Sequence, residues 1–248
     1  MSDLDHDFTG DDDDPWDPAV FPIIDSYLGD SPAPTIQGNR GEMVTGGTGL
    51  GVGDRHSIIA YTADTYTDTE IIVKMEQSML LAGYATIGWR VVSWSGSGNP
   101  ANGYEMQWDI NDNNVNVYSN TSGLNLAFAR DLTNLDPEVE NWWRIYSRGD
   151  RHKIKWWAVG DTEPPTWSID FVDASFAGPG RVYLSAINTD TGDTITVLWD
   201  DLHIGEILPP PPGIRVGQSV ALLEALYIGD HESVVAAYLG DVEFPVPA

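Results

Sequence analysis

Two carboxylates on one predicted strand are the residues of this chain best placed to do chemistry. In the stretch 104–109, Glu105 and Asp109 fall on the same side of an extended strand, with Gln107 between them. At about 3.4 Å per residue they stand about 13 Å apart, whereas glycosidases need carboxylates about 5 to 5.5 Å apart for retention and about 6.5 to 9.5 Å apart for inversion. An amide at the intermediate position can be neither nucleophile nor base. We therefore expect no enzymatic activity, and a hydrolase would require carboxylates from separate strands.

A saccharide site is the second chemistry that the residue types allow. Planar rings stack on the C–H faces of sugars, while amides and charged groups bind sugar hydroxyls. Strand alternation that buries Trp89, Val91, Met106, Trp108, Ile154 and Trp156 points a mixed set outward on strands that we expect to be neighbours. The outward set is Arg90, Glu105, Gln107, Arg144, Tyr146, Lys155 and Trp157. The open alternative is that the charges solvate an ordinary sheet face and that Trp157 covers a loop.

Spacings typical of metal ligands are incomplete in this chain. Asp109, Asn111 and Asn113 match the start of a calcium loop, but position six is Asn114 rather than Gly and position twelve is Asn120 rather than Glu. A hairpin turn explains these residues better. The five His are scattered, and no Cys completes a zinc site, so we expect neither zinc nor an organic cofactor.

Alternation with a period of two dominates residues 56–206. In the stretch 70–76, for example, Ile71, Val73 and Met75 alternate with charged residues. One buried and one wet face is typical of antiparallel sheets, and turn residues at 96–99, 111–114, 148–150 and 190–193 space the strands as in a sandwich. We predict an all-β fold, a two-sheet antiparallel jelly-roll sandwich. Within residues 11–55, the acidic stretch 11–18 and the stretch 46–53, which holds five glycines, are predicted to be loops on the sandwich.

Seven phrases stand in a characteristic order along the chain: 7–10 (DFTG), 83–90 (GYATIGWR), 103–108 (GYEMQW), 143–146 (WRIY), 153–157 (KIKWW), 163–167 (EPPTW) and 196–202 (TVLWDDL). Together they resemble the concanavalin A-like lectin/glucanase jelly roll over residues 1–206. The resemblance implies the fold more than the function. Many jelly rolls of this group hold a structural calcium where the first and last strands meet, which implies a site at Asp7, Asp200 and Asp201. The alternative interpretation, which stays open, is that Asp200 and Asp201 are an ordinary acidic pair at the edge of a sheet.

The C-terminal end reads as an appended module. After four prolines at 209–212, nearly the same phrase occurs twice, at 225–230 (ALYIGD) and 236–241 (AAYLGD). A proline run acts as a semi-rigid spacer, so we predict a linker at 207–213 and a small β-hairpin-like module for assembly or anchoring at 214–248. Fewer than about 40 residues rarely bury a core alone, so the module should dock on something. The assembly contacts predicted are Leu226, Tyr227, Ile228, Tyr238 and Leu239.

Charge and hydropathy narrow the choice of partners. The chain has 38 Asp and Glu against 12 Lys and Arg, a net charge of -26, which repels phosphate backbones, so we expect no nucleic-acid binding. No apolar stretch approaches the roughly 20 residues that span a bilayer, so we expect no membrane insertion. The start of the chain shows no signal-peptide pattern, which predicts synthesis in a cytoplasm.

The repeated C-terminal phrase resembles the short C-terminal repeats of minor tail and other virion proteins of tailed bacteriophages. This resemblance implies a non-enzymatic structural protein of the virion, made in the host cytoplasm. We predict a minor tail protein with other virion proteins as partners, self-association through the C-terminal module, and contact with a cell-surface polysaccharide. Two alternatives remain open: a decoration or minor capsid protein of the head, and a carbohydrate-active enzyme or free lectin.

Overall fold

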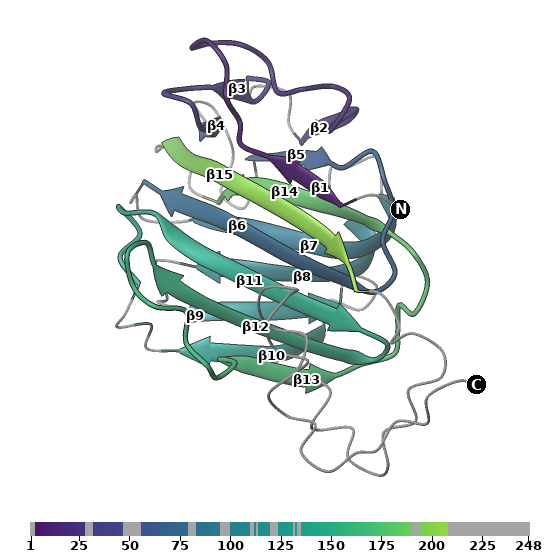
Figure 1. Ribbon diagram of the computed structural model, residues 1–248. Coiled ribbons are helices and arrows are strands. Elements are labelled where there is room, and N and C mark those ends of the chain that lie inside the picture. The colour runs from purple at the N-terminus through teal and green to yellow at the C-terminus, as the bar shows by residue number, and fades with distance from the viewer. Residues whose placement is uncertain are drawn as a thin grey trace, which may run out of the picture. The chain divides into compact units, whose positions relative to one another are not determined.

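The residues that the structure describes form fifteen strands in two antiparallel sheets that pack face to face, which confirms the predicted all-β sandwich (Figure 1). The computed structural model describes residues 3–27, 32–46, 56–78, 83–94, 100–109, 112, 114–119, 124–130, 132, 135–189 and 194–207. Within these ranges every regular element is a strand, and no helix long and apolar enough to cross a membrane occurs.

Sheet A has eight strands in the order β13-β12-β11-β6-β15-β4-β3, with β1 paired to β15. Figure 1 shows β12, β11, β6 and β15 side by side in the nearer layer. The strands are β1 (Leu4–His6), β3 (Thr35–Ile36), β4 (Gly41–Gly46), β6 (Thr69–Gln77), β11 (Asn141–Arg148), β12 (Arg151–Ala158), β13 (Ile169–Val172) and β15 (Thr194–Glu206).

Sheet B has seven strands in the order β10-β9-β8-β7-β14-β5-β2. Neighbouring strands are again antiparallel, and β7 and β8 occupy the middle of the layer. The strands are β2 (Ile23–Tyr27), β5 (His56–Tyr61), β7 (Gly83–Trp94), β8 (Pro100–Asp109), β9 (Asn114–Ser119), β10 (Leu124–Arg130) and β14 (Arg181–Asn188).

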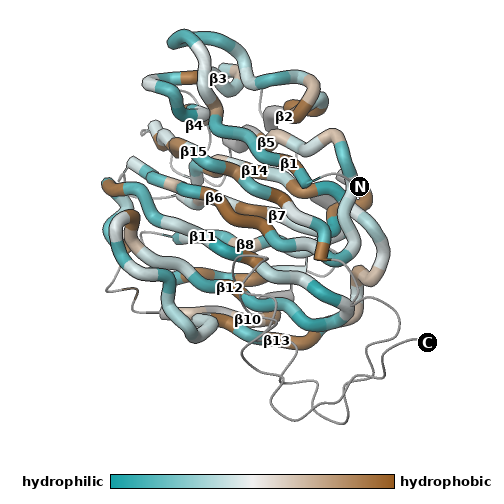
Figure 2. The backbone as a smooth tube through the Cα atoms, in the orientation of Figure 1, coloured by the Kyte–Doolittle hydropathy of each residue, from teal (hydrophilic) through white to brown (hydrophobic). Residues whose placement is uncertain are grey.

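The inward faces of both sheets meet in one core, and apolar residues recur along the strands of both layers (Figure 2). Trp108 on β8 and Trp143 on β11 bring their ring centroids to 5.0 Å and so join the two sheets. Of the residues predicted to face inward, Met106, Trp108 and Ile154 are buried as expected. Full burial of one such side chain contributes about 1.5 to 3 kcal/mol, so this alternation fixes which face of each strand is covered.

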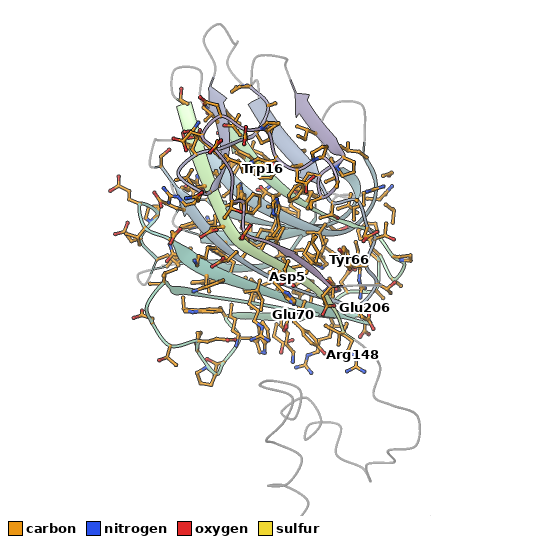
Figure 3. All side chains as sticks on the ribbon, turned by 45° about the horizontal axis from the view of Figure 1, so that its top comes forward. Asp5, Trp16, Tyr66, Glu70, Arg148 and Glu206 are labelled. Atoms are coloured by element: carbon orange, nitrogen blue, oxygen red, sulfur yellow. The ribbon has the colours of Figure 1, made fainter. Side chains whose placement is uncertain are left out.

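Aromatic rings between β1 and β3 complete the core at one end. Phe8, Trp16 and Phe21 are buried, with ring centroids 4.8 Å apart for Phe8 and Trp16 and 4.9 Å apart for Trp16 and Phe21. The indole of Trp16 donates a 3.0 Å hydrogen bond to the carbonyl of Thr35. Figure 3 shows Trp16 and Arg148 well separated along the sandwich. The loop predicted at 11–18 contains no named strand, and the loop predicted at 46–53 lies outside the described ranges except for Gly46 at the end of β4.

A bulge in β7 reverses the alternation that was expected at Arg90 and Val91. Arg90 has a φ of 53°, and the pairing of β7 with β8 shifts register between Trp89 and Ser93. Such a bulge places two consecutive side chains on one face. Arg90 consequently turns away from solvent and is 1% exposed, while Val91 packs with Tyr61 and Tyr183 in a second apolar cluster. The prediction that Arg90 points outward and Val91 inward is wrong for this reason.

The chain divides into two compact units, residues 1–207 and residues 208–248. All the described strands belong to the first unit. The predicted linker at 207–213 lies almost wholly beyond the described ranges, and so does the predicted module at 214–248 with Leu226, Tyr227, Ile228, Tyr238 and Leu239. Their role in assembly stays a prediction.

Candidate functional site

The outer face of sheet B carries three rows of polar and aromatic side chains that cross β14, β7, β8 and β9. The strand register aligns Tyr183, Gly88, Glu105 and Tyr118 in the first row, Ser185, Thr86, Gln107 and Asn116 in the second, and Ile187, Tyr84, Asp109 and Asn114 in the third. Directly opposite side chains on neighbouring strands have Cβ atoms about 4.5 to 5.5 Å apart. We call this set the polar rows; it forms a continuous surface of hydroxyls, amides, carboxylates and phenol rings.

The carboxylate of Glu105 is held rigidly at the centre of the first row. The hydroxyl of Tyr183 donates a 2.6 Å hydrogen bond to Glu105 Oε2, and Gln107 Nε2 donates to Glu105 Oε1. Glu105 is only 7% exposed. Because both carboxylate oxygens accept a hydrogen bond, Tyr183 and Gln107 together fix the orientation of the Glu105 carboxylate.

Gly88 makes the bond between Tyr183 and Glu105 sterically possible. These two residues flank Gly88 in the strand register, one on β14 and the other on β8. A Cβ atom at Gly88 would lie 1.9 Å from Tyr183 Cε1, so the phenol ring lies directly over the glycine. The absence of a side chain at this position lets the Tyr183 ring cross β7 and reach the carboxylate.

Asp109 and the asparagines of β9 are arranged separately from Glu105. Asp109 Oδ1 accepts a 3.1 Å hydrogen bond from the backbone N–H of Asp112 and so stabilises the turn after β8. Asn116 Nδ2 donates to Asn114 Oδ1 at 2.5 Å, which orients both amides along the face. Within the polar rows the two carboxylates Glu105 and Asp109 thus bond to different neighbours and make no shared pair.

Two buried hydroxyls lie side by side in the second row. Ser185 and Thr86 are register partners on β14 and β7, and each is 0% exposed. Among the described residues, neither Ser185 Oγ nor Thr86 Oγ1 has a hydrogen-bond partner. A buried polar group left unsatisfied costs about 1 to 3 kcal/mol. These two unsatisfied hydroxyls lie in the row that also holds the partly exposed Gln107 and Asn116.

The seven residues predicted to point outward at a saccharide site do not form one site. Glu105 and Gln107 lie in the polar rows, and Arg90 lies inside the sandwich, where it donates to the carbonyls of Thr67, Gly149 and Phe176. The expectation that the seven share neighbouring strands is wrong, because β8 belongs to sheet B while β11 and β12 belong to sheet A. The remaining four, Arg144, Tyr146, Lys155 and Trp157, are on the outer face of sheet A.

Arg144, Tyr146 and Trp157 are tied into side-chain contacts on sheet A. Arg144 binds Glu70 at 2.7 Å and Glu163 at 2.6 Å. Burial acts to lower the pKa of Arg144, but these two carboxylates outweigh it and raise the pKa. Trp157 stacks on Trp142 with centroids 6.2 Å apart, and Tyr146 packs near Trp167 at 6.1 Å. Figure 3 shows Glu70 beside Glu206, as the pairing of β6 with β15 requires.

The predicted calcium site at Asp7, Asp200 and Asp201 is not assembled. The first and last strands do meet, since β1 pairs with β15, but the ammonium of Lys74 lies 3.3 Å from Asp200 and 2.5 Å from Asp201. Asp7 instead accepts hydrogen bonds from Thr9. Across the described ranges no group of three or more His, Asp or Glu is placed to hold a metal ion. The ammonium of Lys74 therefore supplies the positive charge at the place where a calcium ion was expected.

A bulge explains why Asp200 and Asp201 both reach Lys74. Consecutive residues of a regular strand point to opposite faces, but β15 shifts register between Asp200 and His203, and Asp201 has a φ of 47°. Burial acts to lower the pKa of Lys74, but the hydrogen bonds that its ammonium donates to Asp201 and Asp200 outweigh burial and raise the pKa overall. The ion pair thus fastens β6 to β15.

Structural comparison identifies the architecture. A prokaryotic β-1,3-1,4-glucanase (lichenase) from a mouse hindgut metagenome matches with a TM-score of 0.59 at 12% identity, covering 84% of this chain and 100% of that one. A carbohydrate binding module from Bacillus subtilis matches with a TM-score of 0.52 at 16% identity, covering 72% and 92%. The fold is the concanavalin A-like jelly roll. No family model and no curated protein sequence matches the chain.

Concanavalin A-like neighbours include both enzymes and binding modules. A putative β-glucanase from Mycobacterium abscessus also matches, with a TM-score of 0.57 at 11% identity over 82% of this chain and 99% of that one. At such identities the likeness establishes the fold alone. The chemistry of this concanavalin A-like chain must therefore be argued from its own side chains.

Six residues of the polar rows escaped the sequence-based prediction: Tyr84, Thr86, Asn116, Tyr118, Tyr183 and Ser185. Each alternates with a buried residue on its strand, as Tyr183 does with Val182 and Leu184. That alternation is visible in the sequence. What the sequence does not show is that β14, β7, β8 and β9 are neighbours, so the rows could not be assembled from it.

Proposed function

We propose that this chain is a non-catalytic carbohydrate-binding protein whose ligand lies on the polar rows of sheet B. The observation that carries the proposal is the fixed acceptor at Glu105, oriented by Tyr183 and Gln107 within a surface of amides and phenol rings. A sugar presents hydroxyl donors and acceptors around C–H faces, which amides, carboxylates and aromatic rings bind together.

The arrangement of the carboxylates supports binding over hydrolysis. General acid and nucleophile must flank one glycosidic bond, whereas Glu105 bonds to Tyr183 and Gln107, and Asp109 bonds to the turn at Asp112. Gln107 lies midway between Glu105 and Asp109 on β8, and its amide can be neither nucleophile nor base. A hydrolase is the alternative, and it would be supported by release of reducing sugar from a glycan that the protein binds.

The buried hydroxyls of Thr86 and Ser185 add a reason for a polar ligand. Each lacks a hydrogen-bond partner in the part of the chain that the structure describes, and both lie in the same row as Gln107 and Asn116. A water or a sugar hydroxyl reaching this row would satisfy groups that are otherwise costly to bury. An apolar ligand would leave the cost unchanged.

Affinity electrophoresis against a panel of polysaccharides tests the proposal. Gln107→Ala and Asn116→Ala should each weaken binding about tenfold or more, since each removes a hydrogen-bonding group from the face. Trp157→Ala is the matched control on the outer face of sheet A and should leave binding unchanged. Loss of binding in Trp157→Ala, with Gln107→Ala and Asn116→Ala unaffected, would move the site to sheet A and refute the proposal.

A place in a bacteriophage virion is the further part of this proposal, and it rests on the phrase repeated at 225–230 and 236–241. In a tail protein a glycan-binding sandwich would contact the host surface; in a head protein it would decorate the shell. Immunogold labelling of particles with antibody to this chain distinguishes the two. If no particle carries the label, the virion role is refuted while the proposal of glycan binding stands.

A further inference from the structure

The side-chain amide of Gln107 is directed at Glu105. Gln107 follows Glu105 by two positions on β8, so both side chains lie on the outer face of sheet B, and Gln107 is partly exposed. Gln107 Nε2 donates a hydrogen bond to Glu105 Oε1, while the hydroxyl of Tyr183 donates to Glu105 Oε2. Each oxygen of the carboxylate thus accepts from one fixed donor.

The carboxylate of Glu105 determines which end of the Gln107 amide faces it. A carboxylate offers acceptors only, whereas an amide has an acceptor oxygen at one end and two N–H donors at the other. If the amide were turned over, Gln107 Oε1 would face Glu105 Oε1, and two acceptors would oppose each other. The orientation of the amide, which its shape alone leaves open, therefore follows from the chemistry of Glu105.

The carbonyl oxygen of Gln107 is left for a ligand. Among the described residues, the only hydrogen bond of the Gln107 side chain is the one to Glu105. Thr86, its register partner on β7, is buried, and its hydroxyl bonds to no described residue. Asn116, its register partner on β9, donates from its amide to Asn114 Oδ1. Gln107 Oε1 is consequently an acceptor that the second row offers at a partly exposed position.

On this basis we propose that Gln107 determines specificity, because the glycan group that meets it must be a free hydroxyl that donates a hydrogen bond to Oε1. This inference rests on the proposed function and deepens it, since it names the group that the glycan must carry. A hydroxyl can donate. An ether oxygen or a fluorine at the same position cannot donate, so it displaces water from Oε1 without replacing the hydrogen bond, and affinity is lost.

The first experiment is an array of gluco-, galacto- and manno-oligosaccharides that also holds, for each compound, every derivative in which one hydroxyl is replaced by fluorine. Fluorine is close to a hydroxyl in size but cannot donate. We expect at least one replacement to weaken binding about tenfold or more, because a site built to bind a hydroxyl rejects the analogue that lacks it. If every fluorinated derivative binds as tightly as its parent compound, the inference is wrong while the proposed function stands. Binding to no glycan would refute the proposed function itself.

Glu105→Gln tests the inference from the side of the protein. The oxygen of the introduced amide can accept from Tyr183, and its N–H groups then face Gln107. Gln107 should therefore turn over, accept at Oε1 and present Nε2 to the ligand. A hydroxyl can accept from that N–H, and a fluorine no longer opposes an acceptor, so the ratio of hydroxyl to fluorine binding should narrow several-fold.

Two further variants make that result interpretable. Glu138→Gln is the matched control, because Glu138 is exposed in the turn before β11 and its replacement changes the net charge equally; it should leave the ratio unchanged. Gln107→Met keeps the length of the side chain but removes the acceptor, so the hydroxyl and fluorinated compounds should bind about equally. A full ratio in Gln107→Met would show that another residue accepts from the hydroxyl, contrary to the proposal. A full ratio in Glu105→Gln alone would show that Glu105 does not orient the amide.

The orientation of the amide can also be observed without a ligand. Neutron crystallography of the free protein locates the deuterium atoms of Gln107. We expect Nε2 to face Glu105 in the parent protein and Oε1 to face position 105 in Glu105→Gln. A parent structure in which Nε2 points away from Glu105 would overturn the inference and leave the proposed function standing.

Discussion

Tyr183 donates a 2.6 Å hydrogen bond to Oε2 of Glu105 from the opposite side of β7. Removal of that hydroxyl in Tyr183→Phe should reduce glycan affinity several-fold, because Glu105 loses one of the two donors that orient it. The free energy of unfolding should fall by about 1 to 3 kcal/mol, since a buried hydrogen bond to a charged group is lost. Calorimetric titration with a bound glycan and urea denaturation measure the two effects.

Tyr66→Phe is the matched control for Tyr183→Phe. Tyr66 is 2% exposed, and its hydroxyl has no hydrogen-bond partner within the described ranges. Its removal should leave affinity unchanged and stability unchanged or slightly increased. Equal losses of affinity in Tyr183→Phe and Tyr66→Phe would show that the bond to Glu105 does not organise the site.

Gly88→Ala should disturb the same site through sterics alone. The new methyl group would lie 1.9 Å from Tyr183 Cε1, so the ring must move away from Glu105 or the strands must separate. Overpacking of this kind costs about 1 to 3 kcal/mol. Thermal unfolding should show a clear decrease in Tm, and glycan binding should weaken as in Tyr183→Phe.

Gly178→Ala serves as the control for Gly88→Ala, because a Cβ atom at Gly178 would meet no atom within 4 Å. It should change neither Tm nor binding by a measurable amount. A Gly88→Ala variant as stable and as active as Gly178→Ala would mean that the Tyr183 ring does not lie over Gly88 in solution.

The sequence was sufficient to predict the core but not the site. Alternation placed Met106, Trp108 and Ile154 inward because burial of alternate side chains is a local property of each strand. Whether two outward residues share a face depends on strand order, which is set by contacts distant in sequence. Glu105 and Arg144 both point outward, yet they lie on opposite sheets.

Two bulges account for the remaining errors of prediction. Each inserts a residue that strict alternation cannot anticipate, and each turns a predicted ligand-binding residue into a structural one. Arg90 faces inward for this reason, and Asp201 joins Asp200 on Lys74. Neither bulge is marked by glycine or proline at the positive φ, so the sequence gives no warning of it.

Arg90 should be essential for stability and not for glycan binding. Besides three backbone carbonyls it bonds Asp68 at 3.2 Å, and its side chain is 0% exposed. Arg90→Met would leave those carbonyls without their donor, and each polar group left buried and unsatisfied costs about 1 to 3 kcal/mol. Arg90→Lys should not rescue the loss, because an ammonium cannot reproduce the planar fork of donors.

Arg151→Gln is the control for Arg90→Met. Its ion pair with Asp170 is exposed, with side-chain exposures of 45% and 39%, and a surface pair of this kind contributes at most about 1 kcal/mol. Urea denaturation should therefore show that Arg90→Met loses several times more free energy of unfolding than Arg151→Gln. Similar losses would contradict the buried position of Arg90.

His152 should make the sandwich sensitive to mild acid. The indole of Trp89 donates a 3.3 Å hydrogen bond to His152 Nδ1, and Nε2 lies 3.1 Å from the carbonyl of Asp173, so the neutral ring carries its proton on Nε2. Burial lowers the pKa of His152 to about 4. The unfolded chain has a His pKa of about 6.5 and so binds more protons between these values. Stability from this residue is complete above about pH 6.5 and is lost as the pH falls toward 4, by about 3 kcal/mol in all.

Urea denaturation at pH 7.5, 5.5 and 4.5 measures that loss, and His152→Gln isolates it. Gln keeps an acceptor and a donor but does not titrate, so the variant should lose less stability than the parent chain between pH 6.5 and 4. Arg90, Asp173 and Asp150 are the charged groups nearest the ring. Burial acts to raise the pKa of Asp173, but hydrogen bonds from Tyr104 and Ser175 lower it overall, so its own effect on stability appears below about pH 4. An NMR titration of the His152 ring with a midpoint near 6.5 would contradict the buried neutral state, as would identical pH profiles for the two proteins.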